Sequence, residues 1–173
     1  MAASDLAQPL ITLDELEHLQ VEFARHQNAL GGVRDKHALE ISLTRPLFKV
    51  GEVLVYDSPP RRAAVLANEL VTRRPFKSCN RRTAVEAIII WMDREKWYML
   101  CTPAELAESL DQLAEGKLPE QQFYLWLARN SRPKPTSHPG GDPGMRRVGS
   151  RANWDPTKES FPPKSLVGPE LGR

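Results

Sequence analysis

The prolines of this chain crowd towards its C-terminal end, and that distribution limits how much of the chain can fold. Eight of the fifteen lie beyond residue 130, with glycines between some of them and few large apolar side chains. Such a segment buries too little apolar surface to offset the entropy lost on ordering. The sequence therefore predicts a folded domain over residues 1–130 and a Pro/Gly-rich disordered tail over residues 131–173. The aromatic residues of the tail, Trp154 and Phe161, are either incidental or part of a short segment that orders on a partner.

Residues 1–130 carry apolar side chains at helical spacing between proline and glycine breaks, which predicts an all-α domain. Helices are expected to begin near Thr12, Asp35, Ser58, Thr83, Thr102 and Pro119. The first helix is expected to turn one face inward, made of Leu13, Leu16, Leu19 and Phe23. Thr102 and Glu105 have the spacing of a reciprocal capping pair. The segment VGEVLVYD, residues 50–57, is rich in β-branched residues and predicts a short strand or flap.

The charge and cysteine content argue against several classes of protein. The formal net charge of +2 is too small by itself to imply a polyanionic partner. Cys79 and Cys101 are the two cysteines, too few for a disulfide framework. No stretch approaches the ~20 apolar residues of a membrane span, and the N-terminus lacks the features of a signal peptide. We therefore expect a protein of the reducing cytoplasm without membrane association.

The stretch RRPFKSCNRRTA, residues 73–84, places several cations directly before an apolar run. That run, residues 83–98, could be a buried strand, but its length favours a central helix. Residues 77–82 would then form the loop at the start of this helix, where backbone N–H groups lack intrahelical partners and the helix dipole is positive. Such a loop suits the phosphates of a nucleotide. Asn80 can hold the loop by bonding its backbone, and Arg82 can fork onto a phosphate.

Two segments of the chain resemble motifs of the Fic/Doc family, in particular its Doc (death-on-curing) branch. The first match is Arg74-Pro75-Phe76-x-x-x-Asn80-Arg81-Arg82-Thr83-Ala84. The second lies upstream and reads Gly31-Gly32-Val33-Arg34-Asp35-x-x-x-Leu39-Glu40-x-x-Leu43-x-Arg45-Pro46. The motifs occur in the order of the family, and the resemblance covers about residues 10–127. Val85 stands where the Fic branch proper carries a second arginine, which also favours the Doc branch.

The resemblance implies a fold, an activity and partners. The family fold is a compact bundle of about six helices with a short flap. Its members transfer part of a nucleoside triphosphate to a protein hydroxyl, a phosphoryl group in Doc toxins and AMP in most Fic enzymes. ATP and Mg²⁺ would be the cofactors. The expected partners are a small inhibitory protein of the antitoxin type and, as target, translation elongation factor Tu.

By the same resemblance, individual residues receive roles. The phosphate-binding positions are Asn80, Arg81, Arg82, Thr83 and the backbone amide of Cys79. The structural positions are Phe76, Arg34, Asp35, Glu40 and Arg45. The reacting positions, however, depart from the family. Arg74 replaces the histidine that acts as general base, and arginine stays protonated in proteins. Ser78 stands at the metal-binding position and is a poor ligand for Mg²⁺, so no metal site is expected.

Three functions remain open on this basis. The first is a Doc-like binding protein that is catalytically impaired, because a general base contributes roughly 10²–10⁴ in rate. The second is an active ATP-dependent phosphotransferase or adenylyltransferase acting on a translation factor, since positioning and charge stabilisation supply much of phosphoryl-transfer catalysis. The third is a nucleic-acid-binding module, which lacks an evident base-reading element. Its basic face would consist of Arg61, Arg62, Arg73, Arg74, Lys77, Arg81 and Arg82.

Overall fold

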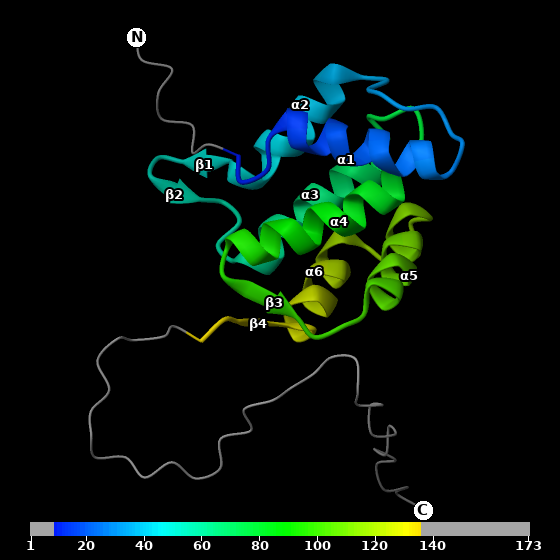
Figure 1. Cartoon of the computed structure of the whole chain (residues 1–173). Helices are drawn as coiled ribbons and strands as arrows, with labels where there is room; N and C mark the ends of the chain where they lie inside the picture. The colour runs from blue at the N-terminus through cyan, green and yellow to red at the C-terminus, as the bar shows by residue number, and fades with distance from the viewer. Residues whose placement is uncertain (1–8, 136–173) are drawn as a thin grey trace, which may run out of the picture. The chain divides into compact units, whose positions relative to one another are not determined.

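Six helices and two short antiparallel strand pairs form the part of the chain that the structure describes (Figure 1). The structure is a computed structural model that describes residues 9–135, all within one unit of the chain, Met1–Thr136. The helices are α1 (Leu13–His26), α2 (Lys36–Thr44), α3 (Pro59–Arg73), α4 (Asn80–Arg94), α5 (Pro103–Ala114) and α6 (Glu120–Arg129), with a 3-10 turn at Arg45–Leu47. The strands are β1 (Lys49–Val50), β2 (Val53–Leu54), β3 (Trp97–Met99) and β4 (Ser131–Pro133). The expected helical fold with a short β-like flap, the β1–β2 hairpin, is confirmed.

Local capping chemistry sets the start of several helices, as the sequence predicts. Thr12 accepts a hydrogen bond from the backbone of Glu15 and forms a full capping box with it, and Thr102 does the same with Glu105. Asp35 accepts from the N–H of Ala38 at 2.9 Å and starts α2. Ser58 holds the corresponding position before α3, but its buried hydroxyl makes no hydrogen bond with the described residues. The start of α3 is therefore set by its two prolines rather than by a side-chain cap.

Helices α3 and α4 pack along each other in the middle of the bundle, with α1 and α2 on one side and α5 and α6 on the other (Figure 1). Small side chains on α3 allow this close approach, and larger ones on α4 fill the space between the layers. The fully buried residues of the two helices include Ala63, Ala64, Ala67, Leu66, Leu70, Ala84, Ala87, Ile88, Trp91 and Met92. The central helix predicted from the isoleucine run is confirmed.

The bounds of α4 differ from the sequence prediction at both ends. The helix begins at Asn80 rather than Thr83, because Cys79 has a left-handed backbone (φ 57°) and the helical geometry starts directly after it. It ends at Arg94, since Lys96 is also left-handed (φ 62°) and reverses the chain. Trp97 and Tyr98, expected to be helical, belong to strand β3 (Trp97–Met99) instead.

Strand β4 moves the domain boundary beyond residue 130. Residues 131–133 were expected in the disordered tail, but they pair with β3, with Met99 opposite Ser131 and Trp97 opposite Pro133. Ser131 is fully buried, and its hydroxyl donates to the carbonyl of Leu127 at 2.8 Å. A proline is tolerated here because β4 lies at the edge of a two-stranded sheet. The remainder of the predicted tail, residues 136–173, lies outside the described residues.

Ion pairs join the helices around the core. The buried carboxylate of Glu69 on α3 binds both Arg45 and Arg73, and Arg45 also lies 3.4 Å from Glu120 of α6. At the other end of the bundle, Arg94 of α4 binds Glu15 of α1 at 2.6 Å. This hydrogen bond, assisted by the backbone of Thr12, lowers the pKa of Glu15 to about 2. Among the described helices, none is both long and apolar enough to span a bilayer.

Candidate anion-binding loop

The loop between α3 and α4 is shaped by two non-glycine residues with left-handed backbones. Arg74 (φ 49°) ends α3, and Cys79 (φ 57°) precedes α4. Between them, Pro75 and Phe76 turn inward, and Phe76 is only 1% exposed. A left-handed backbone costs roughly 1–2 kcal/mol per residue for a side-chain-bearing amino acid, so contacts elsewhere must hold this loop in place.

The upstream motif supplies those contacts. Val33 and Phe76 form an isolated antiparallel bridge. The backbone N–H groups of Arg34 and Asp35 both donate to the carbonyl of Pro75, at 2.7 and 3.0 Å, and the N–H of Lys77 donates to the carbonyl of Gly32 at 3.1 Å. The two segments that resemble Doc-branch motifs, far apart in the sequence, therefore lie side by side in the fold.

Asn80 closes the loop on itself. Its side-chain oxygen accepts from the N–H of Phe76 at 2.9 Å, and its amide nitrogen donates to the carbonyl of the same residue at 3.0 Å. This is the backbone support expected from an asparagine at this position. Because both ends of the amide are engaged, Asn80 acts in this structure by shaping the loop.

The first turn of α4 presents open hydrogen-bond donors. Within the described residues, the backbone N–H groups of Asn80, Arg81 and Arg82 have no acceptor, and no side chain caps this helix. The carbonyl of Cys79 instead accepts from the N–H of Thr83 at 2.9 Å and from its hydroxyl at 3.0 Å. Unpaired donors at a helix start carry partial positive charge, which favours an anion such as phosphate.

The cationic side chains around this turn differ in whether they already have a partner within the protein. Arg81 binds both carboxylate oxygens of Asp111 on α5, at 2.5 and 2.6 Å, so it links α4 to α5. Arg82 lies over the ring of Phe23, 4.6 Å from its centroid, and is exposed. Arg74 and Lys77 are exposed, and their side chains make no hydrogen bond or ion pair within the part of the chain described. Three of the four cations thus remain available to an anion at the loop.

Three of the four upstream positions, Arg34, Asp35 and Arg45, make contacts within the fold. Arg34 donates to the carbonyl of Arg73 at 2.9 Å, which ties the end of α3 to this segment. Asp35 caps α2, and Arg45 belongs to the ion-pair network around Glu69. Glu40 is exposed on α2, and its side chain makes no hydrogen bond or ion pair among the described residues.

One residue that holds the loop together escaped the sequence analysis. Gln20 of α1 is fully buried, and its side-chain oxygen accepts from the N–H of Gly32 at 2.7 Å. Its amide nitrogen lies 3.2 Å from the carbonyl oxygen and 3.3 Å from the hydroxyl of Ser78. One side chain therefore bonds both motif segments.

The spacing of Gln20 from its neighbours in the sequence could have indicated that it is buried. The most buried residues of α1 are Leu16, Gln20 and Ala24, four apart, so a polar residue lies in the middle of the inward stripe. Of the face expected from Leu13, Leu16, Leu19 and Phe23, only Leu16 is fully buried, and the other three are half-buried.

Replacing Gln20 by leucine is expected to lower the free energy of unfolding by about 1–3 kcal/mol, because the N–H of Gly32 and the polar groups of Ser78 lose their buried partner. Chemical denaturation of the variant measures this loss. Gln122→Leu, at an exposed position on α6, is the matched control and should change the stability by no more than about 0.5 kcal/mol. Equal effects of the two changes would contradict the bridging role of Gln20.

The position of Ser78 does not fit a Mg²⁺ site. Its hydroxyl donates to the carbonyl of Leu30 at 2.7 Å and accepts from Gln20, so it is engaged within the protein. Among the described residues there is no group of three or more His, Cys, Asp or Glu side chains that could hold a metal ion. A hard cation requires several oxygen ligands, which this loop does not supply.

The seven residues expected to form a single basic face do not form one. Arg62 is buried and bonds Glu95 and the carbonyl of Tyr56, each at 2.8 Å. Arg61, Arg73 and Arg81 each have a carboxylate partner. These pairs neutralise much of the charge that the sequence placed together, which weakens the argument for nucleic-acid binding.

Comparison of the chain with protein-family models and with curated proteins gives no match. The functional proposal therefore rests on the geometry of the loop and on the two motif segments.

Proposed function

We propose that this protein is a Doc-like protein that binds the phosphates of a nucleotide at residues 77–82, the phosphate loop, and is impaired in group transfer. The observation that carries the proposal is the set of open N–H groups at Asn80, Arg81 and Arg82, beside three available cations. The groups that would hold the phosphates are these three amides together with the side chain of Arg82.

Impairment follows from the chemistry of position 74. An arginine offers no lone pair that could take a proton from a target hydroxyl, whatever its surroundings. ATP fits the open donors, and when bound it would supply the group to be transferred. Mg²⁺ does not fit the protein groups present, so the proposal includes no step that depends on the metal.

The active transferase remains the second candidate. The observation in its favour is that the loop is preorganised: Asn80 and Gln20 fix its backbone before any ligand arrives. Such preorganisation is the larger part of catalysis in phosphoryl transfer. For both candidate functions, the resemblance to the Doc branch is the basis for proposing a translation factor as target and a small antitoxin-like protein as inhibitor.

Calorimetric titration with ATP tests the proposal. Binding of ATP is expected, and binding of adenosine is not, because the phosphates supply the interaction with the open amides. Binding of ATP should persist when Mg²⁺ is chelated, since the loop offers no ligands to the metal. Absence of heat with ATP, or equal binding of ATP and adenosine, would contradict the phosphate loop.

Arg82→Ala is the variant matched to this titration. Loss of one charge-assisted hydrogen bond, worth roughly 1.5–3 kcal/mol, should weaken ATP binding about 10–100-fold. Arg129→Ala, the same change at an exposed position on α6, is the control and should leave the affinity unchanged. An unchanged affinity in Arg82→Ala would remove Arg82 from the binding site.

A further inference from the structure

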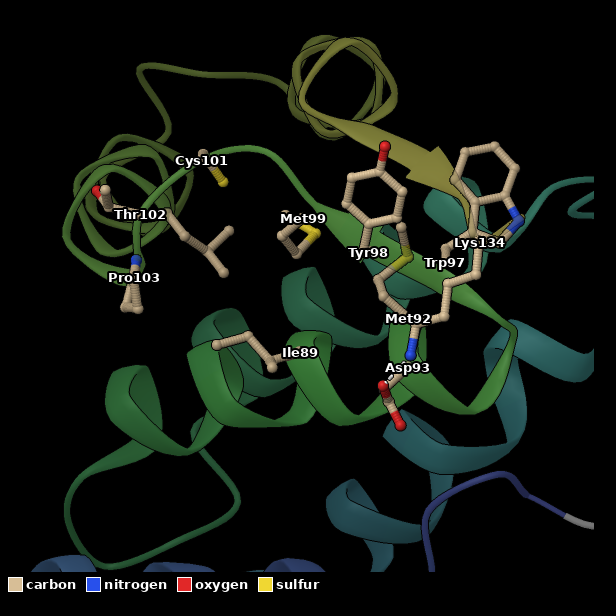
Figure 2. A pocket seen from close by; sticks show the side chains of 11 residues that line it. Ile89, Met92, Asp93, Trp97, Tyr98, Met99, Cys101, Thr102, Pro103 and Lys134 are labelled. Carbon is tan, nitrogen blue, oxygen red and sulfur yellow. Dashed lines mark hydrogen bonds and ion pairs between the residues drawn. The ribbon is translucent and has the colours of Figure 1, made fainter. Parts of the chain in front are cut away.

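A cavity of about 290 Å³ lies between the C-terminal half of α4, strand β3 and the start of α5 (Figure 2). Its walls are mostly apolar and are formed by Ile89, Met92, Trp97, Met99 and Leu106, with Cys101 and Thr102 at the turn into α5. None of the residues of the phosphate loop lines it. The cavity is therefore separate from that loop and lies towards the other end of α4.

We propose that this cavity binds a small, neutral aromatic molecule of about the size of indole. The volume lies at the lower limit of the ~300–1,000 Å³ typical of ligand pockets. It is too small for a nucleoside triphosphate but sufficient for a single- or double-ring compound. Figure 2 shows the side chains of Ile89, Met99 and Cys101 facing the same hollow, so a ligand there would contact three segments of the chain at once.

The lining favours an aromatic ring. Met92 and Met99 bring two thioethers from different elements, and sulfur makes favourable contacts with aromatic rings. Trp97 adds an aromatic surface for stacking or edge-to-face contact. Methionine side chains also adapt their shape to a ligand, which suits an irregular cavity.

The rim favours a neutral ligand. Lys134 and Asp93 form an ion pair at its edge, visible in Figure 2, so each already neutralises the other. An anionic ligand would have to replace Asp93 as the partner of Lys134, and a charge placed against the apolar walls would be costly. The hydroxyl of Thr102 is already bonded to Glu105, so the thiol of Cys101 is the polar group that can contact a ring N–H or hydroxyl.

The two cysteines provide the readout. Cys101 lines the cavity and is half-buried, and burial raises the pKa of its thiol to about 11, so its alkylation is slow. Cys79 lies in the phosphate loop at the far end of α4. Alkylation of the full chain with iodoacetamide, followed by peptide mass spectrometry, measures both rates in one sample. At an indole concentration tenfold above its dissociation constant, alkylation of Cys101 should slow about tenfold and that of Cys79 should not change.

Variants of α4 sharpen the test. Ile89→Trp fills the cavity and should weaken the protection of Cys101 by indole at least about tenfold, whereas Ile90→Trp, at a neighbouring position that does not line it, should keep the protection. If Ile89→Trp does not fold, the rates in the unaltered chain decide alone. Indole protection of both cysteines alike, or of neither, overturns the proposal, as does equal protection in Ile89→Trp. If N-acetyl-tryptophanamide protects Cys101 at a lower concentration than indole does, the cavity would be a binding site for a tryptophan side chain of a partner protein. That result would also overturn the proposal.

Discussion

Arg74→His is expected to raise the transfer of a phosphoryl or nucleotidyl group from ATP to a protein hydroxyl by about 10²–10⁴-fold. The imidazole can take the proton of the attacking hydroxyl, whereas the guanidinium cannot. The site should accept the change, because residue 74 is exposed and histidine tolerates the left-handed backbone found there (φ 49°) better than most side chains. The measurement is incorporation of label from ATP labelled at the α or the γ phosphate, with translation elongation factor Tu as the first acceptor to try.

Arg74→Leu is the control for this experiment. It removes the same positive charge without adding a base, so transfer should stay at the level of the unaltered protein. Since Ser78 also differs from the family, a double variant with Ser78→Asp belongs in the series. If the unaltered protein transfers label as fast as Arg74→His, impairment is wrong. If neither histidine variant transfers any label, the functional resemblance itself is wrong.

Phe76→Ala is expected to lower the free energy of unfolding by about 3–5 kcal/mol. The ring is 1% exposed and belongs to the core between α3 and α4, and its backbone bonds both Asn80 and the upstream motif. Removing it leaves a cavity directly beneath the loop, so ATP binding should weaken together with stability. Denaturation by guanidinium chloride measures the loss. The slope of the unfolding free energy against denaturant concentration should not change.

Phe48→Ala is the matched control, because the same change is made at a side chain that is 59% exposed, next to the β1–β2 hairpin. Its effect on stability should not exceed about 0.5 kcal/mol. A loss at Phe76 as small as that at Phe48 would show that the loop is not anchored through its aromatic residue.

The cysteine-alkylation experiment separates the two sites proposed at the ends of α4. Indole is expected to bind at the end of α4 near Cys101, and ATP at the end near Cys79. Failure of one titration leaves the other untouched, since no lining residue is shared.

The amino-acid sequence determined the features that depend on neighbours a few residues apart. The helix starts at Thr12, Asp35 and Thr102 were predictable because a cap and its backbone partner lie three residues from each other. The loop support by Asn80 was predictable for the same reason, since its partner Phe76 is four residues away.

Only the tertiary structure decided the contacts between distant segments. It placed Gln20 between the two motifs, drew Arg81 to Asp111, buried Arg62 against Glu95 and paired residues 131–133 with β3. Each of these depends on which helix packs against which, and no pattern of spacing along the chain specifies that. A polar or cationic residue has the same local signature whether it faces solvent or a partner from another helix, so its role is set by packing.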